Sequence, residues 1–101
     1  MSHSRTVLLV ENEAKTAEAR RRTLEGCGCT VVIAASGEEA VEKVRSGGDI
    51  DLVVANVDLG AGMSGPETAQ AIIAERSIPV LLCFHTRSFR QGNADSSRDA
   101  V

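Results

Sequence analysis

The chain has 101 residues, of which 43% are hydrophobic and 25% charged, the balance of a single soluble globular domain. The formal net charge of −3 and the absence of Trp and Tyr leave neither a basic field for a nucleic-acid backbone nor aromatic rings for stacking bases. No apolar run approaches the roughly 20 residues that cross a bilayer, and the polar start lacks a signal-peptide pattern. We therefore expect a cytoplasmic protein that binds neither nucleic acid nor membrane.

The three cysteines, Cys27, Cys29 and Cys83, are an odd number, which disfavours a disulfide framework. A C-x-C pair without a second pair or a nearby histidine has too few ligands for a structural zinc site. We expect three reduced thiols, with a turn at Gly28, where glycine permits a positive φ.

The first strand and helix are expected before residue 26. Residues 6–10 read T-V-L-L-V, an apolar run without polar alternation that is typical of a strand covered on both faces. Residues 14–25 are rich in helix formers, and Gly26 is a suitable stop. Arg20, Arg21 and Arg22 point in three directions on such a helix, so we expect them to form a solvated face.

A second strand and helix follow. Residues 29–34 are β-branched and apolar, which favours a strand. Ser36 and Glu39 have the spacing of a capping box, and the glycines at 47–48 predict the end of the helix that the box begins.

A third strand, a glycine-rich loop and a third helix are expected between residues 51 and 75. Residues 51–57 are mostly apolar, residues 60–65 contain three glycines, and Pro66 stands where a helix would begin. Ser64 and Glu67 offer a second capping box. The helical pattern predicts that one apolar face carries Ala69, Ile72 and Ile73.

Residues 79–84 form a fourth strand-like run, entered through a proline. Four strands that alternate with helices predict right-handed crossovers onto a parallel sheet, an α/β doubly wound architecture. Residues 88–101 show no period and contain many turn formers, so we expect one folded domain over residues 1–87 and a disordered or irregular tail over 88–101.

Polar side chains follow three of the expected strands, at the edge where an open parallel sheet binds its ligands. Such acids and amides suit a hard cation such as Mg²⁺. The alternative is that the acids are simply solvated groups before a helix, favoured there by its dipole. The residues at these strand ends are Glu11, Asn12, Glu13, Asn56, Asp58, His85 and Thr86.

Four motifs in this order resemble the receiver domain of two-component response regulators, a CheY-like domain. They are V-L-L-V-E-N-E-A at residues 7–14, L-V-V-A-N-V-D-L-G at 52–60, G-M-S-G-P-E at 62–67 and I-P-V-L-L at 78–82. The resemblance implies a flavodoxin-like fold with strand order 2-1-3-4-5 and a cytoplasmic signalling protein. It also implies that an aspartate after the third strand accepts a phosphoryl group from a histidine kinase with the help of Mg²⁺.

Carried over residue by residue, the resemblance implies a degenerate site. The acidic pair that holds Mg²⁺ falls on Glu11 and Asn12, and the backbone carbonyl that assists it falls on Asp58. The phosphoacceptor position falls on Asn56, and an amide is a poor nucleophile without the charge that Mg²⁺ needs. We therefore expect a pseudo-receiver that accepts no phosphate and binds Mg²⁺ weakly or not at all.

The remaining positions of the family are also altered. The Ser/Thr switch position falls on Phe84, or on Thr86 if the loop is gapped. The fifth strand with its lysine and the fifth helix are missing, which predicts a C-terminally truncated receiver with strand order 2-1-3-4. An apolar fourth strand would then be an open edge, and we expect dimerisation, domain swapping or low solubility, the homodimer forming through residues 80–84.

Three functions remain open. The first is a non-enzymatic receiver-like domain that acts by phosphorylation-independent interaction with a histidine kinase or another signalling protein. The second is a truncated or frameshifted receiver that does not work. The third is a nucleotide-cofactor-binding domain, because Gly60, Gly62 and Gly65 match G-x-G-x-x-G between a strand and a helix, although no acid stands about 20 residues further on.

Overall fold

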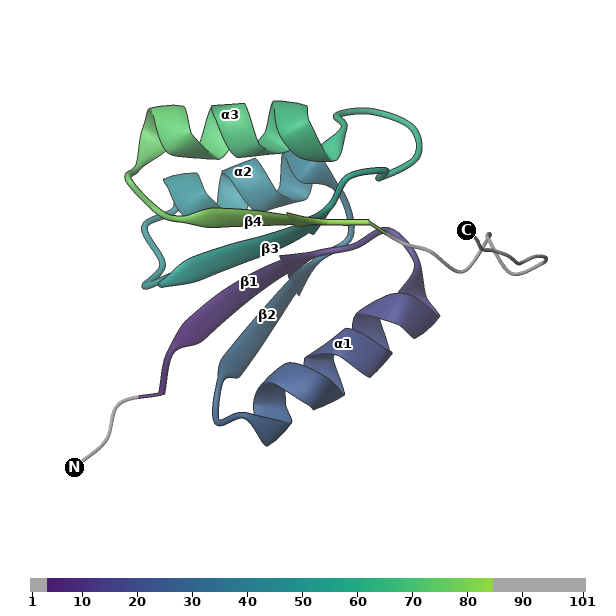
Figure 1. The fold of residues 1–101 in the computed structure, drawn as a ribbon. Helices are drawn as coiled ribbons and strands as arrows, with labels where there is room; N and C mark the ends of the chain where they lie inside the picture. Colours follow the sequence, from purple (N-terminus) through teal and green to yellow (C-terminus); the bar gives the residue numbers. More distant parts are fainter. Residues whose placement is uncertain (1–3, 85–101) are drawn as a thin grey trace, which may run out of the picture.

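The computed structural model describes residues 4–84 and shows strands and helices in strict alternation (Figure 1). The predicted order of elements is confirmed, with bounds that shift by one or two residues. The elements are β1 (Thr6–Val10), α1 (Ala14–Gly26), β2 (Thr30–Ala34), α2 (Gly37–Arg45), β3 (Leu52–Asn56), α3 (Gly65–Glu75) and β4 (Val80–Cys83).

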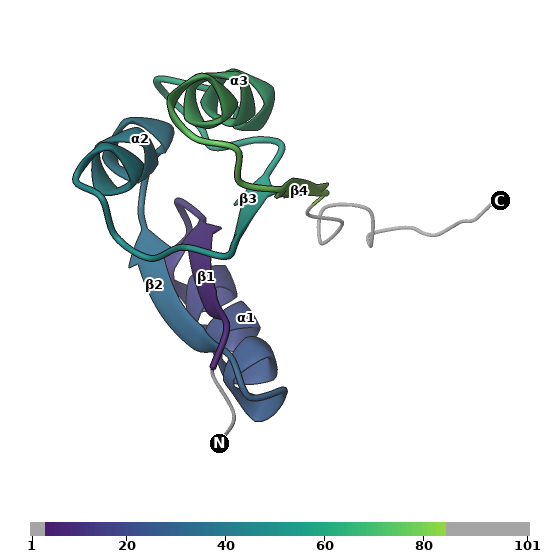
Figure 2. The same ribbon diagram turned by 90° about the vertical axis from the view of Figure 1, so that its left-hand side faces the viewer.

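The four strands form one parallel sheet in the order β2-β1-β3-β4, which confirms the doubly wound, flavodoxin-like architecture. Helix α1 covers one face of the sheet, and α2 and α3 cover the other (Figure 2). The predicted domain boundary at residue 87 and the predicted tail over 88–101 lie outside the described residues.

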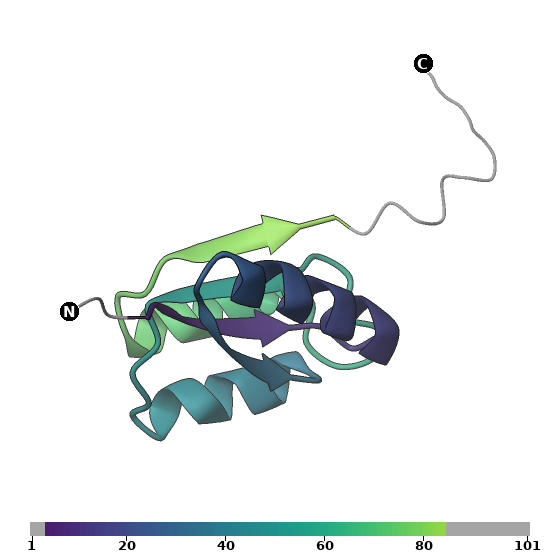
Figure 3. The ribbon, with the colours of Figure 1, turned by 90° about the horizontal axis from the view of Figure 1, so that it is seen from below.

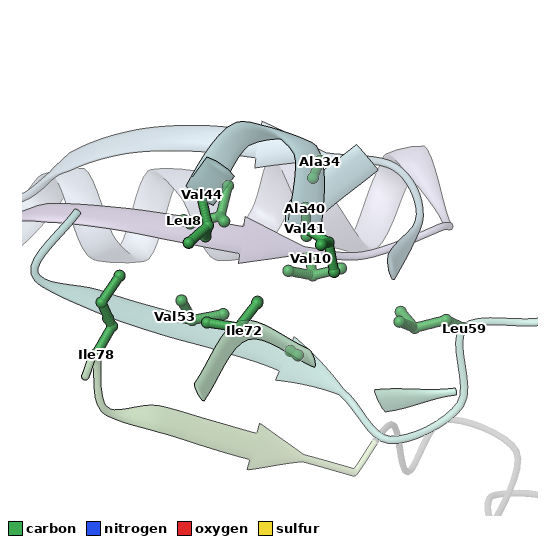
Figure 4. Close-up of a cluster of buried hydrophobic side chains, with 11 residues drawn as sticks. Leu8, Val10, Ala34, Ala40, Val41, Val44, Val53, Leu59, Ile72 and Ile78 are labelled. Atoms are coloured by element: carbon green, nitrogen blue, oxygen red, sulfur yellow. The ribbon is translucent and has the colours of Figure 1, made fainter. Parts of the chain in front are cut away.

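The sheet separates two groups of buried side chains. The larger group lies between the sheet and helices α2 and α3, and side chains from both strands and helices meet there (Figure 4). The smaller group lies under α1 and consists of Val7, Leu9, Ala17 and Val54. The continuous apolar strands are explained by this arrangement, because alternate residues of each strand enter opposite layers.

Both predicted helix starts are present. Ser64 and Glu67 form a full capping box at α3, in which each side chain accepts a hydrogen bond from the other residue's backbone N–H. At α2 the Ser36 hydroxyl accepts from Glu39 N, but the Glu39 carboxylate accepts from Ala35 N instead of from Ser36. The N-terminal turns of both helices are therefore satisfied by side chains.

The predicted apolar face of α3 is partly wrong. Ile72 is fully buried, but Ile73 is 57% exposed. The buried face instead contains Gly65, Thr68 and Ile72. The reason lies in the packing of α3 against α2. A Cβ at Gly37 would overlap the Thr68 side chain, so Gly37 allows α2 to pack directly against Thr68. This contact turns the face with Thr68 towards α2 and leaves Ile73 exposed.

The cysteines agree with the expectation of free thiols, and the arginine run forms ion pairs within its own helix. Cys27, Cys29 and Cys83 are all free, and Gly28 has φ +93°. Arg21 forms ion pairs with Glu18 and Glu25 on its own helix. The hydrogen bond from Arg21 lowers the pKa of Glu18, so much of the basic charge on α1 is neutralised locally.

Candidate functional site

The site lies where β1 and β3 end. Val10 of β1 is in register with Ala55 of β3, so Glu11 and Asn56, the next residues along the two neighbouring strands, lie side by side. Both are almost completely buried, at 3% and 4% exposure. The structure therefore brings together two of the predicted site residues, and the burial makes them more than solvated acids and amides at a strand end.

Each of these two side chains carries an oxygen without a hydrogen-bond partner. Glu11 Oε2 accepts from Glu13 N at 3.1 Å, but Glu11 Oε1 and Asn56 Oδ1 are buried and unpartnered. No ion pair within residues 4–84 involves Glu11. Because buried acceptors without donors are costly, the two oxygens mark a place suited to a cation or a hydrogen-bond donor.

The amide of Asn56 is engaged on its other side. Asn56 Nδ2 donates to the backbone carbonyl of Asp58 at 2.8 Å. The Asp58 side chain makes a separate contact, in which its Oδ1 accepts from Gly60 N at 2.9 Å. A carboxylate at position 56 could not donate this hydrogen bond, so the local geometry is specific to asparagine.

The glycine loop is packed against the site rather than open to a ligand. A Cβ at Gly60 would lie 2.9 Å from Asn12 Nδ2, and one at Gly65 would overlap the Asn56 carbonyl oxygen. Gly60 and Gly62 also have positive φ. These two glycines set the path of the loop, and Gly65 lets α3 begin directly against the end of β3.

Glu38 is a residue at this site that the sequence pattern did not reveal. From the first turn of α2 its Oε2 accepts from Met63 N at 3.0 Å, and a Cβ at Gly62 would lie 2.8 Å from that carboxylate. Glu38 therefore holds the loop after β3 in place. An acid early in a helix is too common to signal such a contact by itself.

Phe84, the predicted switch position, does not lie in the buried cluster with Glu11 and Asn56. Phe84 follows β4 and is 76% exposed. Cys83, the preceding residue, is in register with Asn56. His85 and Thr86, the other residues expected after this strand, lie outside the described residues.

The oxygen atoms at the site suit a hard cation, but they carry few negative charges. Glu11 Oε1 and Asn56 Oδ1 are oxygen ligands of the kind that Mg²⁺ prefers, and the Asp58 carbonyl is close enough to Asn56 for a hydrogen bond. Within residues 4–84, no group of three or more His, Cys, Asp or Glu side chains could hold a metal. The residues would therefore supply one carboxylate, an amide oxygen and a carbonyl.

The fold, with polar side chains gathered at the carboxyl ends of β1 and β3, defines a doubly wound α/β domain with a candidate site at that edge of the sheet. The family model of the response regulator receiver domain matches residues 7–92. The chain belongs to the response regulator receiver domain family of two-component systems.

Individual relatives agree. Over 67 residues, the chain is 45% identical to the sensor kinase CckA of Brucella abortus (strain 2308), a match that spans 65% of this chain and 7% of that protein. The chain thus corresponds to a small part of the length of this curated relative.

No helix in the described part of the chain is both long and apolar enough to pass through a membrane.

Solved structures share the fold. The N-terminal domain of a response regulator/sensory box/GGDEF protein from Carboxydothermus hydrogenoformans is 35% identical, with a TM-score of 0.78 over 92% of this chain and 79% of that one. The response regulator TrrA from Thermotoga maritima, in complex with Mg²⁺-BeF, is 31% identical, with a TM-score of 0.73 over 83% of this chain and 75% of that one.

Proposed function

We propose that this receiver domain acts without accepting a phosphoryl group at position 56, through phosphorylation-independent interaction with a histidine kinase or another signalling protein in the cytoplasm. It is then a pseudo-receiver and not an enzyme. The observation that carries the proposal is the buried amide of Asn56, which donates to the Asp58 carbonyl.

The amide changes both the chemistry and the resting state of the site. An amide oxygen carries no full negative charge and is a poor nucleophile towards phosphorus, so Asn56 forms no acyl phosphate. Its N–H also links the end of β3 to the loop that follows, because it donates to the Asp58 carbonyl. This hydrogen bond supports a fixed conformation that does not depend on phosphorylation.

The same residues support weak binding of Mg²⁺. Glu11, Asn56 and the Asp58 carbonyl would hold the ion, with Asn12 nearby as a source of another amide oxygen. Mg²⁺ would supply positive charge against the Glu11 carboxylate. With one formal charge in place of several, we expect an affinity well below that of a site built from carboxylates.

The test is the intact mass of the full chain after incubation with acetyl phosphate and Mg²⁺. The wild type should gain no phosphoryl increment, whereas the Asn12→Asp, Asn56→Asp double variant should gain one that is labile to base. The Asn12→Asp single variant is the matched control, because it restores charge without restoring the acceptor. A phosphoryl group on the wild type would overturn the proposal and direct attention to Asp58.

A second measurement separates a missing acceptor from a collapsed site. Asn56→Asp places a second buried carboxylate beside Glu11 and removes the donor to Asp58, so it should destabilise the protein by about 1–3 kcal/mol without divalent ions. Mg²⁺ should restore much of this loss in the variant and raise the melting temperature of the wild type little. Equal Mg²⁺ effects on both proteins would contradict the charge argument.

The two other readings of the sequence have less support. For a truncated or frameshifted receiver that does not work, the same melting curves test whether the chain folds, because a chain without a stable fold shows no cooperative unfolding. For nucleotide binding, Gly62 lies against the Glu38 carboxylate, and the first turn of α3 is already capped by Ser64. A carboxylate at that point repels phosphate, and the cap uses a backbone N–H that phosphate would need.

A further inference from the structure

The outer edge of β4 carries backbone hydrogen-bonding groups that pair with no other strand among residues 4–84. The carbonyls of Pro79 and Cys83 accept from Val53 N and Val57 N on the β3 side. Because successive residues of a strand alternate, the N–H and C=O groups of Val80 and Leu82 point away from β3. Among the described residues, β3 is the one strand paired with β4.

The two edge strands of the sheet differ in their cover. Helices α1 and α2 both contact β2, whereas α3 is the one described helix that contacts β4. In Figure 3, β4 forms the margin of the described part of the molecule, and α1, which contacts β1 and β2, does not extend over it. Leu81, in register with Val54 on the α1 side of the sheet, is therefore 55% exposed.

The β4 edge, defined as residues 80–84, has no charged side chain. Exposed edge strands are usually protected by lysine, by an inward charge or by a bulge, and Pro79 only precedes this one. Leu81, Leu82 and Phe84 are 55%, 38% and 76% exposed. Together they expose on the order of 400 Å² of apolar surface, divided between the two faces of the strand.

We propose that the β4 edge binds the β4 edge of a second copy of this chain in antiparallel orientation, which continues the sheet across a twofold axis. A standard interface takes about 800 Å² from each partner, of which a little more than half is apolar. The exposed apolar area of the edge nearly matches that apolar share. The interaction does not involve Asn56 and is therefore independent of the function proposed above.

The geometry also selects a register. A twofold axis perpendicular to the sheet keeps each face on its own side, so only residues of the same face can be opposite each other. With Leu82 on the axis, Val80 is opposite Phe84 of the second copy, and all outward groups of the edge are paired. With Leu81 on the axis, Phe84 would be opposite Ile78, whose N–H already bonds to the Arg76 carbonyl.

In the favoured register, Leu81 is opposite Cys83 of the second copy. Both residues point their backbone groups towards β3, so they form a non-hydrogen-bonded pair with Cα atoms about 4.5 Å apart. That separation is within the range of disulfides. A cysteine at position 81 should therefore cross-link to the native Cys83 of the second copy.

The first experiment is sedimentation of the full chain over a range of micromolar concentrations. The wild type should be a dimer, and Leu82→Lys, which brings two like charges together on the axis, should be a monomer with an unchanged circular dichroism spectrum. Ile73→Lys is the matched control: it charges another exposed aliphatic residue, 57% exposed on α3, and should leave the dimer intact.

The second experiment tests the register by disulfide formation in a Cys27→Ser, Cys29→Ala background. Leu81→Cys should give a covalent dimer on mild oxidation, and adding Cys83→Ser should abolish it. A cross-link that survives Cys83→Ser would overturn the register. A wild type that stays monomeric at every concentration would overturn the dimer itself, whichever way the phosphorylation experiment turns out.

Discussion

The two faces of the sheet are packed to different extents. Eleven buried residues fill the layer under α2 and α3, whereas four fill the layer under α1. Two helices that contact each other cover the first layer. The second layer is covered by one helix, whose contacts within residues 4–84 are with β1 and β2. The comparison suggests that the first face supplies most of the stability and that the second leaves surface for association.

The largest effect should come from the neighbouring leucines of β1. Leu8 and Leu9 are both fully buried, but on opposite faces. Leu8→Ala and Leu9→Ala should each lower the free energy of unfolding by about 2–5 kcal/mol. The loss for Leu8 should lie at the upper end, because a cavity under two helices that contact each other collapses less easily than one under a single helix. Urea denaturation measures both, and equal losses would break the comparison.

A smaller loss is expected from Gly65→Ala at the junction of β3 and α3. The added methyl group would overlap the Asn56 carbonyl oxygen and press on the Cα of Val57, which should cost about 1–3 kcal/mol. Gly26→Ala is the control: nothing lies within 4 Å of its Cβ, and at the end of α1 it should stabilise by up to about 1 kcal/mol. Chemical shifts of Asn56 should change in the first variant only.

Removal of the α3 cap should have a still smaller effect. Ser64→Ala deletes the acceptor for Glu67 N and should cost about 1 kcal/mol. Ser46→Ala removes a hydroxyl that donates to the Lys43 carbonyl after α2, which is not an N-cap. Its expected loss in thermal melting is therefore less than that of Ser64→Ala.

The smallest effect is a pH dependence on the outer surface of α1. The hydrogen bond from Arg21 lowers the pKa of Glu18 below its ordinary value of 4.5, so the folded state favours the ionised form. The stabilisation is present above that ordinary value and is lost as the pH falls through the lowered pKa. The difference in melting temperature between wild type and Glu18→Gln should therefore shrink on acidification, and high salt should shrink it at neutral pH.

Much of the fold could be predicted because each local signal agrees with the next. Apolar runs without alternation, capping boxes and glycine stops identify strands and helices from neighbouring residues alone. The orientation of Ile73 could not be predicted, because it depends on the contact of Gly37 with Thr68 across two helices. Local periodicity contains no information on which side of a helix its neighbour lies.

The site was predictable in its residues but not in its bonds. Strand-end positions and family motifs selected Glu11, Asn56 and Asp58. The hydrogen bond from the Asn56 amide to the Asp58 carbonyl depends on the turn after β3, and the contact of Glu38 with Met63 joins residues far apart in the sequence. Such contacts follow from tertiary packing and have no signature in residue spacing.

Helices α2 and α3 contact each other near their N-terminal ends and again at and just after their C-terminal ends. Near their start, Gly37 lies against Thr68; near their end, Arg45 Nε donates to Glu75 Oε2 at 2.7 Å, and Arg76 Nη1 donates to the Gly48 carbonyl at 2.7 Å. Neither helix can separate from the sheet without disturbing the other. Their amide protons should therefore exchange with deuterium as one cooperative unit. Those of α1, which contacts neither of the other described helices, should exchange through a separate opening of lower free energy.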